Sequence, residues 1–289
     1  MKTLHISHHT RYIYDKPVTF GPHRLMVRPR DGHDMRILGS NLVVSPEADV
    51  RWAYDTFGNS VAFLTFSEPA DQLVIQAELH LERYGLNEAV RTFEPYSGPY
   101  PFSYDSDDRI DLAPVMMIQF PEDRPTVSRW LETVLPTLPD GTLQVLDQLS
   151  SAIHDNFEYR RRDEEGVQTP VQTIETSSGT CRDFALLFME AARDLGFAAR
   201  FVTGYLYDAA TDNGDMLTGG GATHAWADVF IPGVGWVEFD PTNEIVAGHE
   251  LVRVAATRSA EQAQPLSGTF AGDGKFVGME VEIMVKGEA

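Results

Sequence analysis

Apolar and polar residues alternate through the first part of the chain, up to about residue 90. Between residues 73 and 81 every second position is apolar, namely Leu73, Ile75, Ala77, Leu79 and Leu81. Residues 4–14 show nearly the same period of two, and residues 55–59 form a turn-like break between two apolar runs. Such alternation buries one face of an antiparallel sheet and leaves the other in water. We therefore expect residues 1–95 to form a β-sandwich.

The alternation ends in the segment 96–125, which contains several prolines and the acidic run 105–108. This composition predicts a linker or an irregular crossing segment. Helical spacing begins after it, with a short candidate helix at 128–135. A longer helix with Asp140 as its cap is predicted by four apolar residues on one face, Leu143, Leu146, Leu149 and Ile153.

The C-terminal part carries weaker signals. Residues 259–275 are rich in alanine, glycine and glutamine and predict a loop, whereas residues 279–285 alternate weakly and predict a last strand. We expect three parts in the chain: the sandwich 1–95, the linker 96–125 and an α+β domain at 126–289.

The net charge of the chain limits the classes of partner that it can bind. It has 43 acidic and 23 basic side chains in 289 residues, which makes the formal net charge −20 at pH 7. A field of this sign repels phosphate backbones and anionic lipid headgroups. We therefore expect neither nucleic acid nor a membrane as a partner.

The single cysteine, Cys181, allows no intramolecular disulfide and no structural zinc site built from several thiolates. No apolar run approaches the roughly 18 residues that a membrane-spanning helix needs. The first residues lack the apolar stretch of a signal peptide, because His8, His9 and Arg11 interrupt it. A cytoplasmic location is the resulting expectation.

Cys181 stands at the start of a predicted helix. The apolar residues that follow at helical spacing are Phe184, Leu187, Phe188, Ala191 and Leu195. Thr180 and Asp183 have the spacing of a capping box, and Gly196 is placed to end the helix. The positive end of a helix favours a thiolate, which is the nucleophilic form of cysteine. The alternative is structural, since a lone cysteine is usually a small buried hydrophobe.

His224 and Asp240 flank a strand–turn–strand pattern, 16 residues apart. An antiparallel pairing centred on Pro232 would place them opposite each other on one face. Asp228 is the competing carboxylate. It lies four residues along the same strand, about 13 Å from His224, so Asp240 is the better partner for the imidazole. Alternatively, His224 is a hydrogen-bonded strand histidine and Asp240 caps a turn.

A cysteine, a histidine and an aspartate can together transfer an acyl group. The imidazole takes the thiol proton and later protonates the leaving amine, while the carboxylate fixes its tautomer. The backbone N–H of Cys181 could help to hold the oxyanion that forms on attack, and Tyr159 is a candidate for the second donor.

Several segments resemble a known family. Gly179-Thr180-Cys181-Arg182-Asp183-Phe184-Ala185 resembles the cysteine motif of the transglutaminase-like superfamily. His224-Ala225-Trp226 and Phe239-Asp240-Pro241-Thr242-Asn243 resemble its histidine and aspartate motifs, in the same order. Residues 12–18 and 21–30 resemble the N-terminal β-rich region of the bacterial transglutaminase-like cysteine protease group.

The resemblance implies a papain-like α+β catalytic fold, with Cys181 as nucleophile, His224 as base and Asp240 as orienting acid. It implies a cysteine-dependent enzyme that acts on the amide bonds of a peptide, a protein or another amide through an acyl-thioester, without a cofactor. With water as acceptor the enzyme is a peptidase or amidase, which we favour because bacterial relatives are usually described as proteases. With a lysine amine as acceptor it is a cross-linking transglutaminase. A non-catalytic binding module on the same fold is the alternative from another class.

The first strand also contains His5, His8 and His9, which suggest a metal site at first sight. His8 and His9 are adjacent and therefore point to opposite faces of a strand. We interpret the three as histidines of a solvated strand and expect no metal there.

Overall fold

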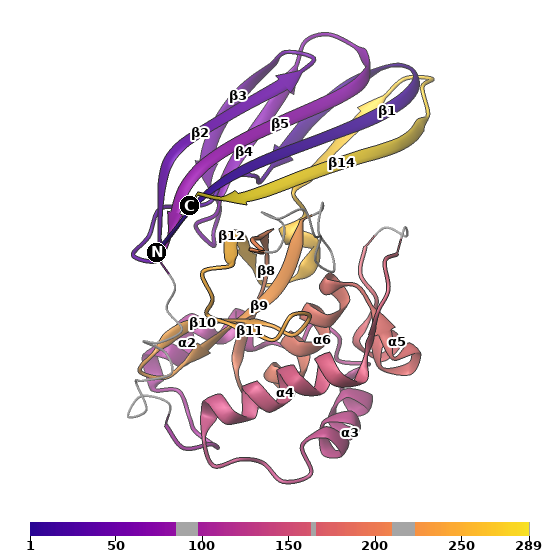
Figure 1. The fold of residues 1–289 in the computed structure, drawn as a ribbon. Coiled ribbons are helices and arrows are strands. Elements are labelled where there is room, and N and C mark those ends of the chain that lie inside the picture. The colour runs from indigo at the N-terminus through magenta and orange to yellow at the C-terminus, as the bar shows by residue number, and fades with distance from the viewer. Residues whose placement is uncertain (85–97, 163–165, 210–222, 289) are drawn as a thin grey trace.

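The structure is a computed structural model, and it describes residues 1–84, 98–162, 166–209 and 223–288. A β-rich region at one end of the molecule packs on a mixed region of helices and a smaller sheet (Figure 1). The predicted fold class, an N-terminal β-rich region followed by an α+β core, is confirmed.

The β-rich region is built around one long strand. The first five strands are β1 (Lys2–Leu25), β2 (Met35–Ser45), β3 (Ala48–Tyr54), β4 (Ser60–Phe66) and β5 (Ala70–Arg83). Residues 2–13 of β1 pair with β5, and residues 23–25 pair with β4. Apolar residues of the two halves meet in one cluster, which contains Leu25, Ala62, Leu64, Ile75 and Ala77. The predicted alternation in β5 and the predicted turn at residues 55–59 are both confirmed.

The end of the chain returns to this region. Strands β13 (Leu266–Ala271) and β14 (Phe276–Gly287) both pair with β1 in antiparallel fashion. Figure 1 shows β14 lying along β1, with the two chain ends close together. The prediction of one unit at 126–289 is therefore wrong at its end. The added strand covers hydrogen-bonding groups of β1 that would otherwise form an open sheet edge.

The predicted loop at 259–275 is also wrong, because it contains β13 and a short 3-10 helix, η2 (Ala260–Ala263). The weak alternation at 279–285 does belong to a strand, although the strand is longer than predicted.

The core combines helices with a five-stranded antiparallel sheet. Its helices are α2 (Ser106–Met116), α3 (Arg124–Val134), α4 (Thr142–Asn156), α5 (Pro170–Thr176) and α6 (Cys181–Asp194). The sheet has the order β11-β10-β9-β8-β12, formed by β8 (Ala198–Leu206), β9 (His224–Ile231), β10 (Gly235–Asp240), β11 (Ile245–Val246) and β12 (Leu251–Thr257). A parallel pair, β6 (Glu158–Tyr159) and β7 (Ser178–Gly179), precedes α6. The buried face of α6 packs against β8 and β9, so the cysteine helix and the histidine strand share one apolar core.

The segment 96–125 is more regular than predicted, since it contains all of α2. The acidic run that suggested a linker starts this helix: the Asp105 side chain accepts hydrogen bonds from the backbone N–H groups of Asp107 and Asp108. Carboxylates are stabilising at a helix N-terminus, so an acidic run marks a helix start as well as a loop. In α4 the cap is Gly141 and not Asp140.

The β-rich region and the core share a buried interface. Leu4, Ile6 and Leu81 of the first region cluster with Tyr205 and Val252 of the core sheet. Arg83 at the end of β5 is buried there and forms ion pairs of 2.7 Å with Asp34 and 2.6 Å with Glu238. No helix in the described part of the chain is long and apolar enough to cross a membrane. The cytoplasmic location stays a prediction.

Candidate active site

Cys181 is the first residue of α6, as the capping pattern predicts. The helix begins after Thr180 with the expected capping box and ends before Gly196, whose φ of 93° only glycine adopts easily. Cys181 is 6% exposed and touches the apolar core. It therefore lies at the edge of the core, with its sulfur at the end of the helix where backbone N–H groups are free.

Asp183 does more than cap the helix. Its buried carboxylate accepts hydrogen bonds from the backbone N–H and the hydroxyl of Thr180, at 2.8 and 2.9 Å, and from the backbone N–H of Gln168 at 2.7 Å. The Arg162 guanidinium lies 3.2 Å away. A Cβ atom on Gly179 would come within 2.8 Å of the Asp183 Cβ, so glycine is required there for this packing. The turn that presents Cys181 is thus held by a fully buried carboxylate.

His224 and Asp240 meet across the hairpin of β9 and β10, but in a different register from the predicted one. Trp236 pairs with Phe230 and Phe239 pairs with Ala227, so the hairpin is centred on Gly233 and not on Pro232. Continued by one residue, this register puts Asp240 opposite Trp226. His224 lies two residues further along on the same face, within reach of a diagonal contact. Its Nε2 atom is 2.7 Å from Oδ2 of Asp240.

Asp240 is held as an acceptor by three groups. Besides the His224 ring, the backbone N–H of Thr242 donates to Oδ1 at 3.0 Å and the Asn243 side-chain amide donates to Oδ2 at 2.8 Å. Burial raises the pKa of Asp240, but the charge and hydrogen bond of His224, together with the hydrogen bonds of Asn243 and Thr242, outweigh burial, and the pKa is lowered overall. An ionised carboxylate only accepts hydrogen bonds, so Nε2 of His224 carries the proton between them.

The charge on His224 is stabilised although the ring is buried. Burial by itself lowers the pKa of His224, but Asp240 and Cys181 together raise it to about 10. The Nδ1 atom is buried and makes no well-aligned hydrogen bond within the described residues. Because Nε2 faces Asp240, Nδ1 is the ring nitrogen left for the Cys181 side of the site.

Tyr159 belongs to the same neighbourhood. Its strand, β6, pairs with β7 so that Tyr159 lies beside Gly179, two residues before Cys181. Burial and then the charge of Cys181 raise the pKa of Tyr159. The structure therefore brings together Cys181, His224 and Asp240, with Tyr159 close to Cys181.

Asp228 is engaged elsewhere, in agreement with the preference for Asp240. It is fully buried and forms an ion pair of 2.8 Å with Arg200, and Arg253 lies 3.6 Å away. Asn243 is the residue that sequence reasoning missed. It follows Asp240 in the quoted motif, but only the fold shows that its amide also lies 3.4 Å from Nε2 of His224.

Of the three β1 histidines predicted to lie on a solvated strand, His5 is exposed and His9 is half-buried, but His8 differs from the prediction. His8 is 4% exposed, and its ring nitrogens contact the Tyr205 hydroxyl at 2.9 Å and the Thr10 hydroxyl at 2.8 Å. Burial and the nearby His9 lower the pKa of His8 to about 4. The period of two correctly places His8 and His9 on opposite faces of β1. The face that carries His8 is covered by the core of the molecule, so His8 is buried and not solvated.

Comparison with known proteins agrees with this architecture. Residues 4–82 match the bacterial transglutaminase-like N-terminal region, and residues 134–241 match the transglutaminase-like superfamily. The fold is thus that of a transglutaminase-like protein. Residues 134–241 thus form a transglutaminase-like core, and residues 4–82 form the N-terminal region known from bacterial transglutaminase-like proteins.

Several individual proteins resemble the whole chain. An uncharacterised protein of Mycobacterium tuberculosis is 28% identical over 278 residues, which cover 91% of this chain and 86% of that protein. An uncharacterised protein of Mycobacterium leprae is 22% identical over 294 residues, covering 95% of both. The crystal structure of a proposed cysteine protease from Cytophaga hutchinsonii has a TM-score of 0.73 and 19% identity, covering 98% of this chain and 90% of that one. This likeness shows a shared fold.

Proposed function

We propose that this protein is a cysteine-dependent amide hydrolase that uses Cys181, His224 and Asp240 as a catalytic triad. The observation that carries the proposal is the buried His224–Asp240 pair, in which the imidazole is charged up to about pH 10 and interacts with Cys181. An imidazolium beside a sulfur at a helix N-terminus is the environment in which cysteine acts as a nucleophile.

The proposed reaction has two halves. The Cys181 sulfur attacks the carbonyl carbon of the amide, and the oxyanion that forms is stabilised by the backbone N–H of Cys181, with the Tyr159 hydroxyl as the second candidate donor. When the C–N bond breaks, the proton on Nδ1 of His224 passes to the leaving amine. Nδ1 then takes a proton from water, and the resulting hydroxide attacks the thioester. The C–S bond breaks to release the acid, and Cys181 returns as a thiolate beside the imidazolium of His224.

Asp240 has the role of holding the ring. Its hydrogen bond to Nε2 keeps Nδ1 directed away from the carboxylate, and its charge favours the imidazolium that exists between the two proton transfers. The three residues do not choose between acceptors, since a lysine amine in place of water gives a cross-linked product by the same steps. We favour water on the basis of the likeness to a proposed cysteine protease.

Alkylation of the single cysteine tests the proposal. Iodoacetamide is small enough for a sulfur on a residue only 6% exposed. An isolated thiol with a pKa of about 8.5 is only ~0.3% ionised at pH 6. We expect one label per chain with a rate nearly constant from pH 6 to pH 9, and a fall of about 100-fold at pH 6 in His224→Ala.

The matched control is His249→Ala, which removes a partly exposed histidine outside the site and should leave the rate unchanged. A slow reaction that His224→Ala does not alter would contradict the triad and favour the non-catalytic binding module. A glutamine-containing peptide with a fluorescent amine then separates the two acceptors. Peptide cleavage supports a hydrolase, whereas amine incorporation without cleavage identifies a transglutaminase.

A further inference from the structure

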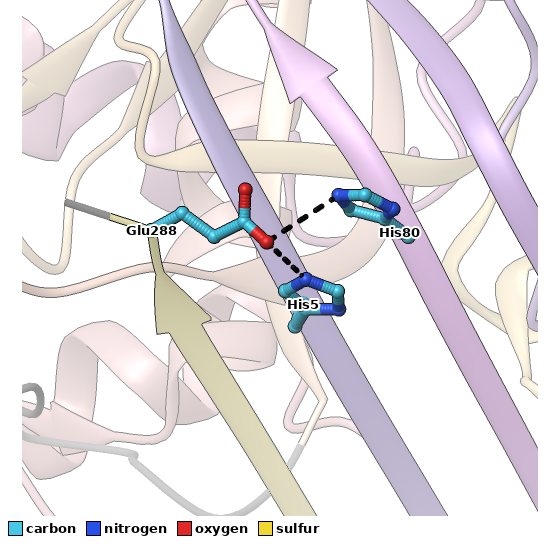
Figure 2. Close-up of side chains that lie close together, drawn as sticks. All are labelled: His5, His80 and Glu288. Carbon is cyan, nitrogen blue, oxygen red and sulfur yellow. Dashed lines mark hydrogen bonds and ion pairs between the residues drawn. The ribbon is translucent and has the colours of Figure 1, made fainter.

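Two histidines and a glutamate from three distant parts of the chain meet on the outer face of the β-rich region. His5 lies in β1, His80 lies in β5, and Glu288 directly follows β14. Figure 2 shows the two imidazole rings side by side, with the Glu288 carboxylate facing both. One nitrogen or oxygen atom of each residue lies within 4.8 Å of the other two.

The backbone places the two rings for a joint contact. His5 and His80 are directly opposite in the antiparallel register of β1 and β5. Their rings are stacked, with centroids 4.1 Å apart and planes 12° from parallel. Side chains directly opposite have Cβ atoms about 5 Å apart, so two imidazoles in this position can turn their nitrogens toward one point.

The third group is fixed by the chain end. The backbone N–H of Glu288 donates to the carbonyl of Thr3 at 2.9 Å, two residues from His5. Oε1 of Glu288 then lies 2.6 Å from Nε2 of His5 and 3.7 Å from Nε2 of His80. The second distance is too long for a hydrogen bond, and Nε2 of His80 is shielded from water without any hydrogen-bond partner among the described residues. The cluster leaves this nitrogen with an unused lone pair or proton.

We propose that His5, His80 and Glu288 bind a divalent transition metal ion of the zinc class. Zinc takes imidazole nitrogen and carboxylate oxygen at about 2.0–2.2 Å, which corresponds to ligand atoms roughly 3.3 Å apart in a tetrahedral site. The two separations from Oε1 of Glu288, 2.6 Å to His5 and 3.7 Å to His80, differ from this by less than 1 Å, and all three ligand atoms lie within 4.8 Å of one another. The three side chains are 36–52% exposed and can rotate. A water molecule would complete the coordination.

The surrounding charges favour a cation on balance. Glu78 and Glu82 stand on either side of His80 in β5 and face the same way, because strand residues two apart share a face. Lys286, which pairs with His5, and Arg36, which pairs with Glu82, are the opposing positive charges. With Glu288, three carboxylates on this face stand against these two cations. The strongly negative chain as a whole also attracts cations. Imidazole with one carboxylate favours zinc, copper or nickel over magnesium or calcium.

A bound ion would tie the C-terminal strand to the start of the chain. It would link β1 and β5 to the residue that follows β14. In the sheet, β1 pairs with both β5 and β14. The site lies on the outer face of this sheet, whereas Leu4 and Ile6 of β1 point into the core. The proposal is therefore independent of the chemistry proposed for Cys181.

Zinc binding to the full chain tests the proposal. Because a cysteine thiolate also binds zinc, all proteins carry Cys181→Ser, and Zn²⁺ is titrated in competition with a chromophoric chelator. We expect one zinc ion per chain, with affinity lowered at least about ten-fold by His5→Ala and by His80→Ala. His9→Ala is the matched control, since it removes an imidazole from the same face of β1 outside the cluster and should leave the affinity unchanged.

A second measurement protects the test against loss of folding. Zinc should raise the midpoint of thermal unfolding in the Cys181→Ser protein, because an ion that binds only the folded state stabilises it, and should not do so after His80→Ala. Absence of binding, or zinc binding that His80→Ala leaves unchanged, would overturn the proposal and leave the three residues as a hydrogen-bonded surface cluster.

Discussion

His8 in the β-rich region and His224 in the core are buried almost equally, at 4% and 2% exposure, yet their pKa values move in opposite directions. Burial and the neighbouring His9 lower the pKa of His8 to about 4, since its partners are neutral hydroxyls. The Asp240 and Cys181 charges overcome burial at His224 and raise its pKa to about 10. A buried imidazole is therefore neutral unless a carboxylate is buried beside it to stabilise the imidazolium. The fold thus contains one histidine that is an uncharged structural group and one that is ready to carry a proton.

The largest expected effect follows from removing the carboxylate. Asp240→Asn leaves His224 buried without its main stabilising charge, so its pKa should fall from about 10 to below 6.5, as at His8. The alkylation rate of Cys181 at pH 6 and any amidase activity should fall by about 10²–10⁴-fold. The pKa is measured from the imidazole NMR signals during a pH titration.

Asp228→Asn is the control for this change, because it also removes a buried carboxylate but one that pairs with Arg200. Asp228→Asn should leave the pKa of His224 near 10. A His224 pKa that stays near 10 in Asp240→Asn would mean that Asp240 is not the source of the shift.

The buried His8 should make the stability of the fold depend on pH. The pKa of His8 is about 4 in the folded chain and about 6.5 in the unfolded chain, so only the unfolded chain gains this proton as pH falls. The free energy of unfolding should therefore decrease by up to about 3 kcal/mol between pH 6.5 and pH 4 on account of His8. His8→Asn should make the slope of stability against pH shallower over this window, as measured by urea unfolding.

His224 should affect the free energy of unfolding at alkaline and not at acidic pH. Because its pKa is higher in the folded chain, its contribution to stability is fully present below pH 6.5 and is lost as pH rises through about 10. His249→Asn, at a partly exposed position, should leave both slopes unchanged. Parallel unfolding curves for the wild-type and His8→Asn proteins between pH 6.5 and pH 4 would contradict the assignment of a neutral His8.

The smallest effect is expected at Asn243. Its amide donates to Oδ2 of Asp240 and lies near Nε2 of His224, so Asn243→Ala removes one hydrogen bond from an otherwise intact pair. One hydrogen bond to a charged group corresponds to about 1.5 kcal/mol, or roughly ten-fold in the alkylation rate at pH 6. Asn243→Asp is the informative second variant. It places a like charge beside Asp240 and should lower the rate further, whereas equal rates in all three proteins would mean that Asn243 has no positioning role.

Local patterns predicted much of the fold and of the candidate site. The alternation in residues 73–81 correctly predicts β5, and the capping pattern around Cys181 correctly predicts the start of α6. Both signals depend only on residues a few positions apart in the sequence. The choice of Asp240 over Asp228 also followed from strand geometry alone. The prediction of a linker from the acidic run at the start of α2 is wrong for the same local reason, since carboxylates begin helices and also occur in loops.

Neighbouring side chains in the sequence were enough to indicate the candidate residues Cys181, His224 and Asp240 and to predict which segments form strands or helices. Three features depend on contacts between distant segments: the centre of the β9–β10 hairpin at Gly233, the pairing of β14 with β1, and the proximity of His5, His80 and Glu288. Each of these features depends on how two strands pair. The competing pairings differ only by one residue of register or by the sheet edge to which a strand adds, and local sequence does not distinguish them. The charge of a histidine was decided in the same way, since it depends on whether the group that the fold brings to it is a hydroxyl or a carboxylate.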